Sequence, residues 1–133
     1  AQQRAQIAAE YSIEVETVTH LLNRYGSMIS EVLEIISEDS SLAKKLDPTL
    51  PYIKAEIVYA ASHEGASSVD DVISRRTRLA FEAPNYALGL TKAVADLIAP
   101  TLGWGAKDKK ASIAEYESIA AAEKAALDNL VNS

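Results

Sequence analysis

Residues 50–65, LPYIKAEIVYAASHEG, carry the clearest helix signals in the chain. Pro51 suits the first turn of a helix, because its missing N–H is not needed there and its fixed φ is helical. Gly65 suits the end of a helix, where a left-handed residue is wanted. An apolar stripe at helical spacing lies between them, formed by Ile53, Ile57 and Ala60 or Ala61. We therefore expect a helix over Tyr52–His63 that buries this stripe.

The same helix carries a second face that is polar and aromatic, formed by Tyr52, Glu56, Tyr59 and His63. A Glu flanked by aromatic residues is more often a satisfied structural acid, or an acid that meets Arg across an interface, than a general base. We expect Glu56 to play one of the first two roles. The pair His63 and Glu64 admits the same alternatives.

Upstream of this segment the pattern predicts two helices. The first begins at Ser12 as its N-cap and ends at Gly26, with an apolar stripe of Val15, Val18, Leu22 and Tyr25. The second, Met28–Glu38, follows Ser27 as its cap, and its apolar residues cover more than half of its circumference, so we expect burial from several sides. Residues 4–11 are expected to form a frayed turn or a short helix, and residues 42–46 one more helical turn.

Downstream, three further helices are predicted. Ser68 and Asp71 have the spacing of a capping box and open a helix that Pro84 closes. A longer helix is expected over 85–99, with Pro100 as its stop and Leu90, Val94, Leu97 and Ile98 inward. The last helix follows the turn at 103–105 and places Ile113, Tyr116, Ala120 and Leu127 on one side. Its Ala-rich end is too small to bury much surface, so we expect it to project or to pack on a part outside this chain.

Composition agrees with an all-α fold. The chain has 133 residues, of which 48% are apolar, with only five Gly and four Pro, and Ala is the commonest residue. This predicts a single domain over 1–133, a compact bundle of about five to seven short helices. The net charge of −6 disfavours nucleic acid as a partner. Because no apolar run approaches the roughly 18 residues of a membrane span and no signal peptide is visible, we expect a cytoplasmic segment without direct membrane insertion.

Several chemistries lack the residues that they need. The chain has no Cys and only His20 and His63, so neither a Cys-His zinc site nor a thiol nucleophile can be built. The closest Gly pair, Gly103 and Gly105 around Trp104, fits an interhelical turn better than a phosphate-binding loop. Composition leaves a Ser-His-acid triad open, but the sequence contains no Gly-x-Ser-x-Gly elbow. We assign no catalytic, cofactor-binding or metal-ligating residue in this chain.

The sharpest local signal is a cluster of guanidinium groups from Arg75, Arg76 and Arg78. Such groups grip carboxylates and phosphates in a bidentate fork. Three roles are open: pairing within the bundle, with Glu56, Glu64, Asp70 or Asp71; contact with another domain; or direct contact with a ligand.

Five segments together resemble a known family. They are HLLNRYG at 20–26, LPYIKAEIVYA at 50–60, HEGA at 63–66, DVISRRTRL at 71–79 and LGW at 102–104. In order and spacing they are similar to the C-terminal helical domain of FAD-dependent glycerol-3-phosphate dehydrogenases and the related glycerophosphate oxidases. The resemblance covers about Val18–Tyr116, most of the chain.

The resemblance implies a function for a longer polypeptide. Members of the family oxidise sn-glycerol 3-phosphate to dihydroxyacetone phosphate, pass hydride to FAD and deliver electrons to membrane quinone or, in the oxidases, to oxygen. Their FAD-binding and substrate-oxidising machinery lies in a long N-terminal part, which this chain does not contain. The chain is thus expected to be a non-catalytic C-terminal domain, inactive and free of FAD by itself, with that N-terminal part as its partner and its parent enzyme peripheral on the cytoplasmic face of the membrane.

One hypothesis covers the polar residues singled out above. We expect them to stabilise the domain or its contact with the N-terminal part: Glu56, Tyr59, His63, Glu64, Arg75, Arg76 and Arg78. The alternative is a free-standing helical interaction module that binds a protein through the face at 75–78.

Overall fold

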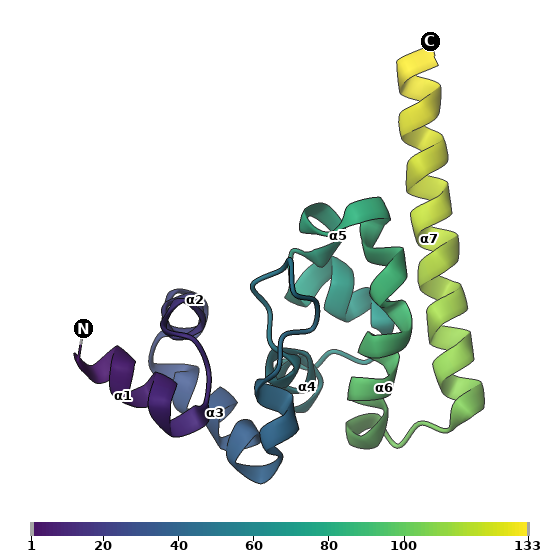
Figure 1. Ribbon diagram of the computed structural model, residues 1–133. Helices are drawn as coiled ribbons and strands as arrows, with labels where there is room; N and C mark the ends of the chain where they lie inside the picture. The colour runs from purple at the N-terminus through teal and green to yellow at the C-terminus, as the bar shows by residue number, and fades with distance from the viewer. Residues whose placement is uncertain (1, 133) are drawn as a thin grey trace. The chain divides into compact units, whose positions relative to one another are not determined.

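The computed structural model describes residues 2–132, which are built from helices (Figure 1). Seven α-helices follow one another in this part of the chain: α1 (Gln2–Tyr11), α2 (Val15–Tyr25), α3 (Ile29–Glu38), α4 (Lys54–Ser62), α5 (Leu79–Glu82), α6 (Thr91–Leu102) and α7 (Ala106–Asn132). Shorter turns join them: η1 (Gly26–Met28), η2 (Ser40–Ala43), the π-type η3 (Asp71–Arg76) and η4 (Pro84–Leu90). No strand occurs among the described residues. The prediction of an all-α fold with five to seven helices is confirmed.

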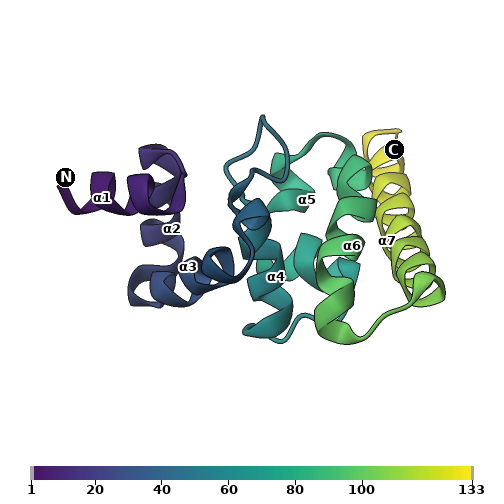
Figure 2. The ribbon, with the colours of Figure 1, turned by 60° about the horizontal axis from the view of Figure 1, so that its bottom comes forward.

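Two compact units divide the chain, one up to Tyr59 and the other from Ala60 onward. Helix α4 crosses the boundary between them. In the first unit α1, α2 and α3 contact one another, and in the second α6 lies alongside α7 in both views (Figure 1, Figure 2).

Helix α3 supplies most of the core of the first unit. Its buried residues lie on several sides of the helix, as the sequence predicts. The core cluster consists of Leu21, Ile29, Val32, Leu33, Ile35, Ile36, Ile53, Ala55 and Tyr59. Full burial of one Leu or Ile side chain stabilises a fold by about 1.5–3 kcal/mol, so this cluster is the main source of stability in the unit.

Ser12 does not open α2, and that prediction is wrong. Its φ is 57°, and the N–H of Ile13 donates to the carbonyl of Ala8 at 3.0 Å. These are the marks of a Schellman motif, in which a left-handed residue ends a helix. Ser12 therefore ends α1, which is a regular helix rather than a frayed turn, and α2 begins only at Val15, whose side chain is 45% exposed.

Gly26 ends α2 as predicted, with a φ of 56° and its N–H donating to the carbonyl of Leu22. Ser27 does not cap α3, because the turn η1 connects α2 to α3 without a break. Met28, expected in the apolar set of α3, lies in this turn and is 54% exposed.

A loop before α4 shifts the start of that helix. The N–H of Leu46 donates to the carbonyl of Tyr52 at 2.9 Å, and the N–H of Lys54 donates to the carbonyl of Lys44 at 2.8 Å. Residues 52 and 53 are thus held in a bridge with the preceding chain, and Ile53 pairs with Lys45. The prediction that Pro51 occupies the first turn is wrong, because the helix begins at Lys54.

In the second unit, η3 opens with the predicted capping residues. The Ser68 hydroxyl accepts the N–H of Asp71 at 3.0 Å, and the Asp71 carboxylate accepts the N–H of Ser67 at 2.9 Å. The fully buried apolar residues of this unit include Val69, Val72, Ile73, Leu79, Val94, Ala95 and Ile98.

Residues 85–87 break the helix that the sequence predicts over 85–99. Asn85, Tyr86 and Ala87 have φ values of 52°, 57° and 62°, so three consecutive non-glycine residues are left-handed. Each costs roughly 1–2 kcal/mol relative to right-handed backbone. Helix α6 begins at Thr91 and runs through Pro100, which is therefore not a stop; it lies exposed in the last turn.

Helix α7 packs on the unit through its first half. The Ser112 hydroxyl accepts the N–H of Val69 at 2.9 Å, and the Tyr116 hydroxyl donates to the carbonyl of Tyr86 at 2.6 Å. Tyr116 and Ala120 are each 2% exposed, whereas residues 121–132 are exposed throughout. Leu127 lies in this exposed second half, and its side chain is 51% exposed.

The hydrogen bond from Tyr116 predicts a specific stability effect. Tyr116→Phe removes the donor that holds the left-handed segment, so we expect a loss of about 1 kcal/mol in the free energy of unfolding. Urea denaturation followed by circular dichroism measures it. Ser118→Ala removes a hydroxyl from the exposed side of α7 and serves as the control; equal effects from both variants would contradict the assignment.

Candidate functional site

The carboxylate of Glu56 is the centre of a buried polar network in the first unit. The residue is 1% exposed. Its Oε2 accepts the N–H of Ile53 at 2.8 Å, and its Oε1 accepts the hydroxyl of Tyr25 at 3.0 Å. His20 Nε2 lies 2.9 Å and Arg24 Nε 3.6 Å from the same Oε1. Both carboxylate oxygens therefore have partners.

The start of α4 explains why an acid is accepted here. Ile53 immediately precedes the helix, and the side chain of Glu56 reaches back to its N–H, as the third residue of a capping box does. A negative group in the first turn also interacts favourably with the helix dipole. The sequence thus places an acceptor where the helix has an unsatisfied donor.

Helix α2 supplies the other partners from its last two turns. His20 and Arg24 are four residues apart and so share one face, while Tyr25 is the last residue before Gly26 ends the helix. The guanidinium of Arg24 lies 5.3 Å from the ring centre of Tyr25 and 5.6 Å from that of Tyr52. The imidazole of His20 meets Tyr52 edge to face at 5.3 Å.

Burial and charge shift the pKa of Tyr25. Burial of the phenol, followed by the negative charge of Glu56, raises this pKa well above its usual value, although Arg24 opposes the shift. The hydroxyl therefore keeps its proton and remains a donor to Glu56 over the whole physiological range.

Tyr59 connects α4 to α3. Its hydroxyl donates to Glu31 Oε1 at 2.7 Å, and its ring meets Tyr25 edge to face at 5.3 Å. Together with Glu56, it makes α4 the element to which both α2 and α3 are attached by side-chain hydrogen bonds.

The other predicted site residues belong to the second unit. His63 is exposed, and its Nδ1 lies 2.7 Å from the Ser62 hydroxyl. Glu64 is half-buried, and its Oε1 is a buried oxygen without a hydrogen-bond partner among the described residues. The structure thus brings Glu56 and Tyr59 together in one network and leaves His63 and Glu64 to the second unit.

The arginine cluster is mostly exposed. Arg75 lies 3.5 Å from Asp71, one of the acids that the sequence offered as partners, and its side chain is 70% exposed. Arg78 pairs with Glu82 at 3.4 Å, an acid outside the set of partners predicted from the sequence, and its guanidinium lies over the ring of Phe81. Arg76 is also exposed. Exposed pairs of this kind contribute about 0–1 kcal/mol each, so they add little to the fold.

Sequence reasoning missed the partners of Glu56. His20, Arg24 and Tyr25 lie more than 30 positions earlier in the chain, and no local pattern joins them to Glu56. The available signal was the spacing of two basic side chains on one face at the end of a helix that Gly26 terminates.

The arrangement around Glu56 supports a structural role rather than acid–base chemistry, because both carboxylate oxygens have partners within the protein itself. Within residues 2–132, no three His, Asp or Glu side chains gather closely enough to hold a metal ion. None of the helices described there is long and apolar enough to cross a membrane.

Several known proteins are similar to this chain in sequence. A family model for the C-terminal domain of alpha-glycerophosphate oxidase matches residues 1–109. Glycerol-3-phosphate dehydrogenase 2 of Mycobacterium tuberculosis (strain ATCC 25618 / H37Rv) is 37% identical over 121 residues, which are 91% of this chain and 21% of that protein. Glycerol-3-phosphate dehydrogenase of Mycobacterium leprae is 36% identical over 117 residues, 88% of this chain and 20% of that protein. A mitochondrial glycerol-3-phosphate dehydrogenase of Arabidopsis thaliana is 32% identical over 99 residues, 74% and 16%.

The chain spans about a fifth of the length of these relatives. No solved structure gives a significant match. The relatives therefore contain a long region to which no part of this chain corresponds.

Removal of the Glu56 charge tests the network. In Glu56→Gln the side chain keeps its size but offers an N–H group where Tyr25, His20 or Ile53 needs an acceptor. We expect the free energy of unfolding to fall by about 2–3 kcal/mol, as measured by urea denaturation. The matched control is Glu34→Gln on the exposed side of α3, for which we expect a change within about 0.5 kcal/mol. Equal stability of the two variants would contradict a structural role for Glu56.

The raised pKa of Tyr25 predicts loss of stability at alkaline pH. In the unfolded chain Tyr ionises near pH 10, whereas the folded state holds the proton more tightly, so this contribution is complete below about pH 10 and is lost above it. Between pH 10 and 12 the unfolding free energy of the unmodified chain should fall more steeply than that of Tyr25→Phe, by up to about 1.4 kcal/mol per pH unit. Tyr11→Phe should keep the steep dependence. Parallel curves for all three proteins would show that Tyr25 titrates normally.

Proposed function

Because the chain belongs to the family of the C-terminal domain of alpha-glycerophosphate oxidase, we propose that it is the non-catalytic C-terminal domain of an FAD-dependent glycerol-3-phosphate dehydrogenase. The observation that carries this proposal is the coverage of the relatives. Proteins named glycerol-3-phosphate dehydrogenase match nearly the whole chain, and the chain accounts for only about a fifth of their length. The remaining region of such a polypeptide is large enough for a separate catalytic part.

In this proposal the N-terminal part performs the redox reaction. It oxidises the secondary alcohol of sn-glycerol 3-phosphate to the ketone of dihydroxyacetone phosphate, passes the hydride to FAD and delivers the electrons to quinone. The parent enzyme lies in the cytoplasm as a peripheral protein on the membrane face. The present chain holds no FAD and turns over no substrate by itself.

The residues of the chain take architectural roles. Glu56 and Tyr59 brace the first unit, since their polar atoms bond to α2, α3 and the start of α4. Arg75, Arg76 and Arg78 present guanidinium groups on the surface of the second unit, where they can meet acidic groups of the N-terminal part. His63 and Glu64 follow the end of α4 and belong to the same proposed contact region.

The free-standing interaction module is not favoured. Its distinguishing requirement is a native polypeptide of about the size of this chain, whereas the relatives that match it are several times longer.

The test compares the chain with the whole gene product that contains it. We expect the whole product to purify with bound flavin and to reduce a soluble quinone analogue when sn-glycerol 3-phosphate is supplied. The isolated chain, mixed with excess FAD and desalted, should retain no visible absorbance. Flavin retained by the isolated chain, or a whole product without flavin and without this oxidation, would overturn the proposal.

A further inference from the structure

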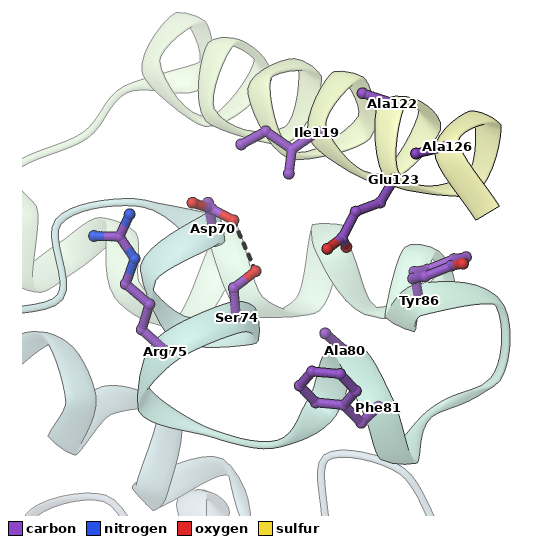
Figure 3. A pocket seen from close by; sticks show the side chains of 10 residues that line it. All are labelled: Asp70, Ser74, Arg75, Ala80, Phe81, Tyr86, Ile119, Ala122, Glu123 and Ala126. Carbon is purple, nitrogen blue, oxygen red and sulfur yellow. Dashed lines mark hydrogen bonds between the residues drawn. The ribbon is translucent and has the colours of Figure 1, made fainter. Parts of the chain in front are cut away.

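A groove of about 560 Å³ opens in the second unit between the η3–α5 segment and the C-terminal half of α7 (Figure 3). Figure 3 shows Ile119 and Glu123 projecting from α7 toward the side that carries Ser74 and Ala80. All of its lining residues lie between Asp70 and Ala126, so the groove belongs to one unit.

The walls of the groove carry apolar side chains among the polar ones. Phe81 is 80% exposed and Ile119 is 39% exposed, and both line the groove. On the α7 side, Ala122 and Ala126 are too small to fill the space opposite them. Two large exposed apolar side chains around a hollow mark a place where another apolar group can be buried.

The charge of the lining is predominantly negative. Arg75 contributes a positive charge, but its guanidinium lies 3.5 Å from the carboxylate of Asp71, a residue that does not line the groove. Asp70, whose Oδ1 accepts the Ser74 hydroxyl at 2.8 Å, and Glu123 remain as two carboxylates from opposite walls. Burial, with smaller contributions from these same two charges, raises the pKa of Tyr116, which agrees with both carboxylates lying close to this helix position.

A strained backbone presents one wall. Tyr86 lines the groove from the left-handed segment 85–87, and its carbonyl accepts the hydroxyl of Tyr116. Backbone strain of this kind persists where the surroundings enforce it and is concentrated at binding and switch regions. The groove therefore has a fixed wall rather than a loose loop.

We propose that this groove docks a segment of the N-terminal part of the same polypeptide, one that buries an apolar side chain against Phe81 and Ile119 and directs a Lys or Arg toward Asp70 and Glu123. The inference rests on the proposed function, which supplies the additional chain. Charge complementarity disfavours a second copy as the occupant, because a chain of net charge −6 is repelled by an acidic groove. A segment of the same polypeptide also has the high effective concentration that a shallow site needs.

The experiment is photo-crosslinking in the whole gene product. Phe81 is replaced by p-benzoylphenylalanine, which keeps an aromatic ring in the groove, and the same amino acid replaces Lys107 as the control on an exposed position of α7 outside the groove. Peptide mapping should place the crosslink of position 81, several-fold above that of position 107, in an N-terminal segment with an apolar residue next to Lys or Arg. Adding Glu123→Lys should lower this crosslink several-fold, whereas Glu115→Lys, on the exposed face of the same helix, should not.

The result overturns the proposal in any of three cases: a crosslink to a second copy or to a different protein, no crosslink above the control, or a crosslink that Glu123→Lys leaves unchanged. Flavin content and sn-glycerol 3-phosphate oxidation are measured on the same samples. If both are present without the crosslink, the docking proposal fails and the proposed function stands. If both are absent, the proposed function fails, and docking of a catalytic part fails with it.

Discussion

The buried carboxylate of Glu56 is the interaction on which the first unit depends. A polar group this deeply buried costs about 1–3 kcal/mol if it lacks partners, and more if it carries charge. The fold meets this requirement with Tyr25 and His20 from α2 and with the N–H of Ile53 at the start of α4. One side chain thereby links the end of α2 to the beginning of α4. Leu21 from α2 and Ile53, just before α4, belong to the same apolar cluster as the buried residues of α3.

The second unit depends on a strained segment of backbone and not on a buried charge. Three left-handed residues carry the chain from α5 to α6, and the hydroxyl of Tyr116 bonds to the carbonyl of the middle one. Helix α7 supplies that hydroxyl and also Ser112, which bonds to the N–H of Val69 before η3. The first half of α7 thus closes the unit, and its second half leaves the groove open beside Phe81.

Local sequence signals predicted the features whose causes are local. Gly26 ends α2, Ser68 and Asp71 open η3, and α3 is buried on several sides, because each of these depends on residues within one or two turns. One error has a local cause: the N–H of Ile13 donates to the carbonyl of Ala8 at 3.0 Å, so Ser12 ends α1 and does not open α2. The other errors arise where distant residues decide. The break at 85–87 depends on Tyr116, thirty positions later, and the partners of Glu56 come from another helix. The sequence pattern predicts the polar and aromatic face of Tyr52, Glu56 and Tyr59. It does not predict that Tyr25 and His20 meet the carboxylate of Glu56.

The central claim is that Glu56 braces the domain and takes no part in the oxidation that we propose for the N-terminal part of the polypeptide. The most direct test compares the whole gene product with and without Glu56→Gln. The thermal unfolding temperature of each protein is measured first, and kcat for sn-glycerol 3-phosphate oxidation is then measured well below both unfolding temperatures. The account predicts a lower unfolding temperature with kcat per folded molecule unchanged. A large loss of kcat with an unchanged unfolding temperature would contradict it and would assign the Glu56 carboxylate to the reaction.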